Sequence, residues 1–268
     1  MRETFIRFGI FLGLLLLFSI LESIYPRRDR VYPRSFRWPN NLAVLTAGSL
    51  VSRIVPALLP ISAALLAAQQ QVGLFHIAAL PGWAEFILTI LLLDLLIYWQ
   101  HRLLHTVPLL ARIHRMHHTD RDIDATTALR FHPLEIVLSM LIKTSAVWIL
   151  GAPAPAVLVF EIILNGTAMF NHANLFIPYR VDAELRKLLI TPDMHRIHHS
   201  VRKSERNSNY GFALAWWDYI FGSYTAEPAD GYQGMEIGIS GYEGRAHQLI
   251  TWMLALPFLS QKQPIQED

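Results

Sequence analysis

Histidine is the residue type in this chain whose spacing indicates chemistry. Ten of the twelve histidines lie between His101 and His199, and eight of those fall into three short groups. Residues separated by three or four positions share one face of a helix, so each group can present its imidazoles to a single place. The groups are His101 with His105; His114, His117 and His118; and His195, His198 and His199.

Such groups predict metal binding. The chain contains no cysteine, so a metal must be held by nitrogen or oxygen. Eight imidazoles exceed one octahedral shell, and a catalytic metal also keeps a position open, which predicts two ions with four or five imidazoles each. Neutral imidazole suits zinc, copper, iron or nickel, so the ligands alone do not name the metal. A histidine pH sensor is the alternative, but it does not require repeated ligand spacing.

Other polar residues have simpler interpretations. His76 and His247 stand alone in the sequence and are interpreted as surface or structural residues. Asp120, Asp122 and Asp124 are interpreted as a solvated loop. No H-E-x-x-H motif occurs, which argues against a zinc protease.

The composition indicates an integral membrane protein. Of the 268 residues, 53% are hydrophobic and only 16% are charged. Apolar stretches at residues 8–25, 42–68 and 84–100 predict crossing helices, the second of them kinked at Pro56 and Pro60. Shorter stretches at 136–150 and 156–170 flank a Gly/Pro-rich turn and predict a helical hairpin. We therefore expect an all-α bundle of about four membrane-crossing or re-entrant helices.

The distribution of Lys and Arg predicts the orientation of this bundle. Basic residues are abundant in segments 26–40, 101–133 and 179–206, whereas segment 69–83 has none. Cytoplasmic loops are the ones rich in Lys and Arg, so every histidine group is expected at the cytoplasmic side, in a helical cap on the bundle. We expect a multi-pass protein of a bacterial inner membrane. A net charge of +2, spread over separate clusters, gives no indication of nucleic acid binding.

The residues around the histidines resemble those of the fatty acid hydroxylase/sterol desaturase superfamily. Segment 94–105, which reads DLLIYWQHRLLH, is similar to the family's first histidine box. HRMHH at 114–118 and HRIHH at 195–199 are similar to the second and last boxes, and Asn171-His172 matches a histidine often found between them. RFHPLE at 130–135, NYG at 209–211 and WDYIFG at 217–222 extend the likeness.

This resemblance implies a non-haem di-metal centre, normally two iron ions with zinc as a substitute, that activates O2 to hydroxylate or desaturate a lipid. It implies that the eight grouped histidines are ligands, with His172 a ninth and His132 a ligand or a neighbour of one. Electrons would come from cytochrome b5 or a ferredoxin with its reductase, because the sequence contains no flavin or nicotinamide fingerprint. Sterol, fatty acyl, ether-lipid, sphingoid and carotenoid substrates all remain open.

Several polar residues are expected to support the ligands. Asp94 and Tyr98 share a helical stripe with His101, and an acidic residue inside a span needs a partner. We expect Asp94 to orient an imidazole or to pair with Arg102, and Asn171 to support His172. Glu161 and Asn165 are weaker candidates for such a role.

Three regions are expected: N-terminal membrane helices at 1–83, a catalytic region at 84–225 and a C-terminal segment at 226–268. A membrane metal transporter or metal store is the alternative function. Transport calls for polar groups at several depths of the membrane, whereas these histidines collect on one side, which favours an enzyme.

Overall fold

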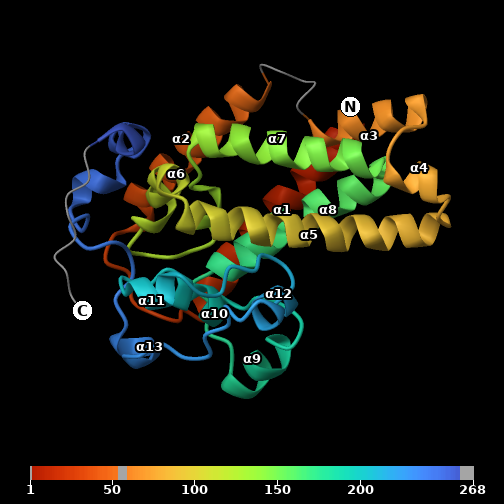
Figure 1. Ribbon diagram of the computed structural model, residues 1–268. Helices are drawn as coiled ribbons and strands as arrows, with labels where there is room; N and C mark the ends of the chain where they lie inside the picture. Colours follow the sequence, from red (N-terminus) through yellow and green to blue (C-terminus); the bar gives the residue numbers. More distant parts are fainter. Residues whose placement is uncertain (1, 54–58, 260–268) are drawn as a thin grey trace.

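Four long apolar helices form the body of the protein in a computed structural model, which describes residues 2–53 and 59–259 (Figure 1). They are α1 (Arg2–Ile24), α5 (Gly82–Thr106), α7 (Pro133–Leu150) and α8 (Ala154–His172). Each contains a segment of at least 18 residues that is long and apolar enough to cross a membrane. No β-strand occurs in the described residues. The expectation of an all-α bundle with four candidate crossings is confirmed.

The expected hairpin is present as α7 and α8. Gly151 ends α7 with a left-handed φ of 65°, and Pro155 lies in the first turn of α8. A side chain at Gly151 would meet the carbonyl of Val72, 2.6 Å from the position of its Cβ. Glycine therefore serves here both for its conformation and for the close approach of another segment.

The expectation of one kinked crossing helix at 42–68 is wrong. The structure has two separate helices, α2 (Arg34–Arg53) and α3 (Pro60–Gln70), and both pack against α7. The first half of α2 is polar and α3 has only 11 residues, so neither can cross a membrane by itself. Pro56 and the side chain of Arg53 lie outside the described residues.

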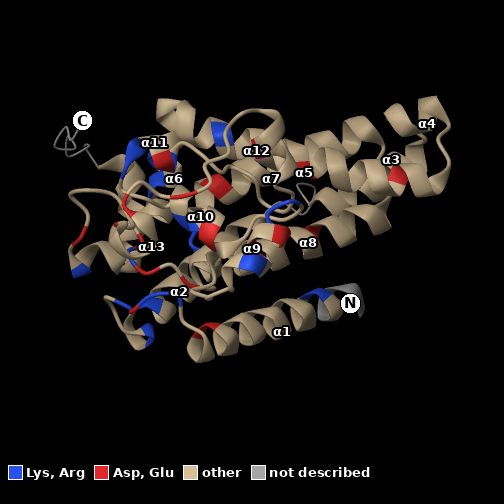
Figure 2. Ribbon diagram, turned by 90° about the horizontal axis from the view of Figure 1, so that it is seen from below, with Lys and Arg blue, Asp and Glu red and all other residues tan. Residues whose placement is uncertain are grey.

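Short helices form a polar cap at one end of the bundle, and charged residues concentrate there while the long helices are largely uncharged (Figure 2). Within residues 2–53 and 59–259 the 3-10 turns are Thr127–Leu129, Arg245–Gln248 and Leu256–Phe258. α4 (Leu74–Ala78) lies at the opposite end of the bundle (Figure 1). The cap helices are α6 (Pro108–His118), α9 (Tyr179–Leu185), α10 (Pro192–His198), α11 (Lys203–Arg206), α12 (Trp216–Ile220), α13 (Gly231–Gly234) and α14 (Ile250–Ala255).

The outer surface of the bundle carries large apolar side chains. Leu16, Leu65 and Ile77 are 62%, 60% and 81% exposed. A soluble monomer seldom exposes such side chains over a continuous surface, because leaving them in water is unfavourable. The exposed apolar surface is therefore suited to the hydrocarbon core of a membrane.

Asp120, Asp122 and Asp124 do not form the solvated loop that was expected. They are buried around Arg37 of α2, which is 1% exposed. The Arg37 guanidinium donates to Asp120 at 2.6 and 3.1 Å, to Asp124 at 2.5 Å and to the Asp122 carbonyl. Burial alone would raise the pKa of Asp120, but the charges of Arg37 and Arg130 and the hydrogen bonds from Arg37 and Thr127 together outweigh burial and hold this pKa below its usual value. This buried network joins α2 to the segment that follows α6.

Replacing Arg37 with Met is expected to reduce the free energy of unfolding by about 3–5 kcal/mol, because two carboxylates would remain buried without their partner. Unfolding in mixed detergent micelles, followed by circular dichroism, measures the change. Lys187→Met is the control, since Lys187 and its partner Glu184 are 68% and 73% exposed and an exposed pair contributes at most about 1 kcal/mol. Equal losses in the two variants would contradict the importance of the Arg37 network.

Candidate metal centre

Nine histidines converge where the cap meets the bundle. The last turns of α5 carry His101 and His105, and the chain turns at Val107 and Pro108 to begin α6. α6 carries the second histidine group, and His172 ends α8. α10 is capped by the Thr191 hydroxyl, which accepts from the Met194 amide, and Pro192 is its first residue, as the sequence predicts. α10 presents the last group.

The nine imidazoles divide into two groups, in each of which the ligand atoms lie within 4.8 Å of one another. The first group, called the five-histidine group here, is His101, His105, His114, His118 and His198. The second, the four-histidine group, is His117, His172, His195 and His199. All nine except the half-buried His105 are fully buried.

Each H-x-x-H-H motif divides its three histidines between the two groups, and the two motifs do so in opposite proportions. His114 and His118, one turn apart, belong to the five-histidine group, whereas His117 between them belongs to the four-histidine group. In the last motif His195 and His199 belong to the four-histidine group and His198 to the five-histidine group. Each motif therefore contributes to both groups, which ties the two together.

The ring nitrogens in these groups are spaced like ligands of a metal. In the four-histidine group the Nε2 atom of His172 lies 3.0 Å from those of His117 and of His195, and the Nε2 atoms of His195 and His199 are 3.3 Å apart. In the other group the Nε2 atoms of His114 and His118 are 3.2 Å apart. Two ligands bound at right angles, each about 2.1 Å from a metal, are separated by about 3 Å.

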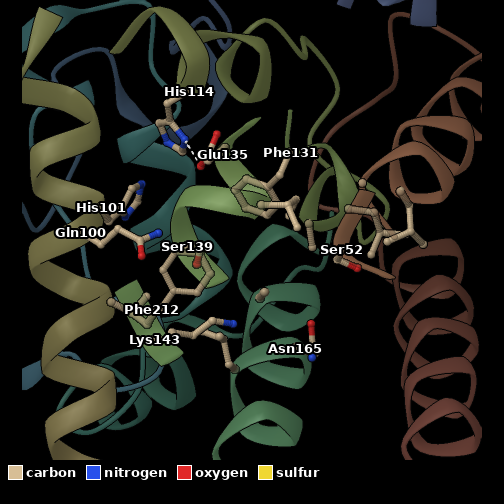
Figure 3. Close-up of a pocket in the computed structure, with 18 of the residues that line it drawn as sticks. Ser52, Gln100, His101, His114, Phe131, Glu135, Ser139, Lys143, Asn165 and Phe212 are labelled. Atoms are coloured by element: carbon tan, nitrogen blue, oxygen red, sulfur yellow. Dashed lines mark hydrogen bonds and ion pairs between the residues drawn. The ribbon is translucent and has the colours of Figure 1, made fainter. Parts of the chain in front are cut away.

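Hydrogen bonds to Nδ1 fix the orientation of four of these rings. His101 contacts the Tyr210 carbonyl at 2.7 Å, His172 the Ala168 carbonyl at 2.7 Å, and His198 the Ser208 carbonyl at 2.8 Å. Because a carbonyl only accepts, Nδ1 carries the proton and Nε2 keeps a lone pair. His114 contacts a carboxylate oxygen of Glu135 at 2.7 Å (Figure 3). These contacts have the form of the second-layer hydrogen bonds that orient metal-bound imidazoles.

The donor set fits bound cations. The Nε2 lone pair of His172 faces two other Nε2 atoms at 3.0 Å, and one lone pair cannot accept from both. The Nε2 atoms of His101, His105 and His198 are buried without a hydrogen-bond partner among the described residues. Buried polar atoms are seldom left in this state, and a metal ion in each group would satisfy them.

Several of the grouped histidines have a lowered pKa, which favours their neutral form at pH 7. Burial, reinforced by the charge of neighbouring histidines, lowers the pKa of His117, His118, His195 and His199 well below the usual value. Burial also lowers the pKa of His198 to about 3. A neutral imidazole keeps the lone pair that a metal requires, so these rings are ready to bind a cation at pH 7.

Asp94 has a different role from the one expected. It neither orients an imidazole nor pairs with Arg102; it accepts from the backbone amides of Ala213 and Leu214 at 3.3 and 3.1 Å, and from the Trp217 indole at 2.8 Å. Arg102 instead donates to the Tyr98 hydroxyl at 3.3 Å. Asp94 therefore fastens the segment after the last histidine motif to α5.

Other expected supporting residues also contact this segment. The Tyr98 hydroxyl lies 2.8 Å from that of Ser223, and the Asn171 amide donates to the Phe212 carbonyl at 2.8 Å. Asp218, which the sequence interpretation missed, accepts from the amides of Tyr210 and Gly211, each at 2.8 Å. Asp218 therefore binds the amides on both sides of the Tyr210 carbonyl, the group that orients His101.

His132 does not join either group, so of the two roles expected for it, a ligand or a neighbour of one, the structure does not support that of a ligand. Its Nδ1 accepts from the Leu134 amide at 3.1 Å and its Nε2 faces the Leu254 carbonyl at 3.2 Å, so both ring nitrogens are used. It caps the N-terminus of α7. The residue of this segment that reaches a ligand is Glu135, one helical turn later, and its place in the RFHPLE stretch was the available signal.

A cavity of about 210 Å³ reaches the five-histidine group from inside the bundle. His101, His114 and Glu135 line its upper end in Figure 3, and Phe131 and Phe212 belong to its largely apolar wall. Its lining comes from α1, α2, α5, α6, α7 and α8 and from the segments of Phe131 and Phe212. An alkyl chain in this cavity would lie beside the histidines and away from water.

Comparison with known proteins identifies relatives of this arrangement. The model of the fatty acid hydroxylase family matches residues 86–223, just over half of the chain and the region that holds all nine grouped histidines. No solved structure matches significantly.

Three curated relatives illustrate the range of similarity. Ornithine lipid hydroxylase OlsE from Rhizobium tropici is 25% identical over 87% of this chain and 70% of its own length. Human alkylglycerol monooxygenase is 31% identical over 54% of this chain and 32% of its own length. A very-long-chain aldehyde decarbonylase, GL1-6 from Oryza sativa subsp. indica, is 31% identical over 48% of this chain and 21% of its own length. The chain thus spans only a third or less of the last two.

The family match covers the helices that carry the histidines, and the geometry places those histidines in two groups able to bind metal ions. The resemblance seen in the sequence is thereby confirmed: this chain belongs to the fatty acid hydroxylase family.

Proposed function

We propose that this protein is a membrane-embedded, O2-dependent lipid hydroxylase or desaturase, in which the five-histidine and four-histidine groups each hold one iron ion. The observation that carries the proposal is that the five-histidine group, which lies next to the four-histidine group, is reached by a largely apolar cavity within candidate membrane-crossing helices. Ornithine lipid hydroxylase and alkylglycerol monooxygenase, whose names describe lipid oxidation, support it.

The protein's own residues position the substrate and exclude water. An unactivated C–H bond offers no acid–base handle, so bound iron would supply the redox chemistry with O2. The apolar wall holds an alkyl chain beside His101 and His114, while Tyr210, Ser208 and Glu135 keep the imidazoles in orientation. Hydroxylation takes one oxygen atom of O2 into the lipid and the other into water, and consumes electrons and protons.

The electrons come from outside the chain in this proposal, from cytochrome b5 or a ferredoxin with its reductase. The charged cap is the surface next to the histidine groups, and such a donor would dock there (Figure 2). The basic segments 26–40, 101–133 and 179–206 favour a cytoplasmic location for this cap, in the inner membrane of a bacterium. A metal transporter is disfavoured because the grouped histidines all lie at one end of the bundle.

Metal analysis and lipid analysis together test the proposal. Purified protein is expected to contain about two iron ions per chain, and cells with the gene are expected to contain a lipid that differs from its precursor by an added oxygen or by the loss of hydrogen. Inductively coupled plasma and lipid mass spectrometry measure these quantities. One metal ion or fewer in folded protein, or an unchanged lipid profile, would contradict the proposal.

Single substitutions test the division of the histidines. His195→Ala and His198→Ala each remove a ligand from a different group, so each is expected to lower the iron content from about two ions to about one and to abolish turnover. His247→Ala is the control, because His247 lies outside both groups and contacts Trp252. Full iron content in either test variant would refute the assignment of that histidine.

Glu135→Gln tests the hydrogen bond to His114. A neutral amide is a weaker acceptor than a carboxylate, so metal affinity or turnover is expected to fall about 10- to 100-fold. Iron retention during titration with a chelator measures the affinity. Glu184→Gln is the matched control, since that side chain is 73% exposed and pairs only with Lys187. Equal iron retention by the two variants would remove Glu135 from the site.

A further inference from the structure

Three polar residues form a stripe along the face of α7 that lines the cavity. Glu135, Ser139 and Lys143 are four residues apart, so they lie above one another on the helix. Figure 3 shows Glu135 beside His114 and Lys143 at the other end of the cavity. Eight residues of helix separate these two ends by about 12 Å.

Lys143 carries a charge that nothing described in the protein neutralises directly. It lies within a candidate membrane span, and its side chain makes no hydrogen bond or ion pair with any residue in 2–53 or 59–259. Figure 3 shows its amine directed into the cavity toward α8, which carries Asn165. An ionisable side chain at membrane depth is costly and commonly marks a functional site.

The charges near Lys143 leave one positive charge in excess. Glu161 and Arg7 are the charged groups whose fields act on Lys143. Glu161 already forms an ion pair with Arg7 at 2.6 Å, and that carboxylate is largely buried. Two basic side chains, Arg7 and Lys143, therefore lie near one carboxylate, and only Arg7 is paired with it. A second anion beside Lys143 would balance the charge of this part of the membrane interior.

The cavity itself accepts a molecule that has both an apolar and a polar part. Its walls near the histidines include Phe131, Phe212 and Leu104, which suit an alkyl chain. A hydrocarbon alone would leave the Lys143 ammonium without a partner in an apolar environment, which is unfavourable. An amphiphile with an acidic group would satisfy both ends.

We propose that Lys143 binds the acidic group of the lipid substrate, a carboxylate or a phosphate, and thereby places a carbon about 12 Å away beside the five-histidine group. This inference rests on the proposed function and narrows its substrate to an anionic amphiphile. Lys143 acts as a specificity residue at a distance from the metal centre. It selects the headgroup and sets which part of the chain reaches the histidines.

Equilibrium binding in detergent micelles tests this inference with three ligands of equal chain length. Radiolabelled palmitate provides the carboxylate, hexadecyl phosphate the phosphate and hexadecanol an uncharged alcohol. The wild-type protein is expected to prefer one or both acids over the alcohol by about tenfold or more, because the acid pairs with a desolvated ammonium. The better of the two acids identifies the headgroup chemistry.

Variants assign that preference to Lys143. Lys143→Met is expected to abolish the preference while leaving hexadecanol binding within about twofold, and Lys143→Arg is expected to retain it. Lys187→Met, an exposed lysine on the cap, is the control and is expected to keep the wild-type preference. A wild-type protein without preference for an acid, or a Lys143→Met variant that keeps it, overturns the inference.

Glu161→Gln provides an independent test if Lys143→Met does not fold. Removing that carboxylate increases the excess of positive charge, so preference for the acids is expected to rise, and an unchanged or lower preference overturns the inference. Hexadecanol binding shows that each variant retains its cavity. Because binding requires neither O2 nor an electron donor, loss of lipid oxidation with intact acid binding would refute the proposed function alone.

Discussion

The packing of nine imidazoles into one largely buried space is the constraint on which the rest of the structure depends. Ring nitrogens that approach to 3.0–3.3 Å with lone pairs facing one another are unfavourable without a cation between them. Carbonyl and carboxylate contacts behind four of the rings hold them there, from the Ala168 carbonyl in the same helix as His172 to the Tyr210 carbonyl more than 100 positions from His101. The packing of the cap segments keeps these rings in place.

That requirement explains why so much of the cap is polar and yet buried. Arg37 brings three carboxyl-bearing residues of the segment after α6 against α2. Asp94 of α5 holds the segment of residues 210–223 against that helix, and Asp218 joins the two ends of the segment. Each buried charge meets several donors or acceptors, as a low-dielectric interior demands. The bundle and the cap are therefore joined by charged contacts around the histidine groups. We expect the loss of one of these contacts to change the positions of the imidazoles.

Local spacing made the histidine helices and the α7–α8 hairpin predictable, because helical periodicity and Gly or Pro signals act over a few residues. The partition of the rings was not predictable in this way. His117 differs from His114 and His118 only in the direction it faces, and that direction has meaning only once α8 and α10 are in place. The burial of Asp120 and Asp124 depends on Arg37, more than 80 positions away. His132 joins neither histidine group because it caps the start of α7, and Glu135, for which the sequence predicted no role, contacts His114 instead.

Two residues of α7 have different expected roles, one beside the histidine groups and one in selecting the substrate. Glu135, at the first turn, acts on a ligand of the five-histidine group, and Lys143, two turns further into the bundle, faces the cavity. A single helix thus sets both the position of the imidazoles and the position of a cation relative to them. Since a helix is stiff over this length, the separation between the reacting carbon and the polar group of a substrate is fixed by the fold rather than by flexible loops.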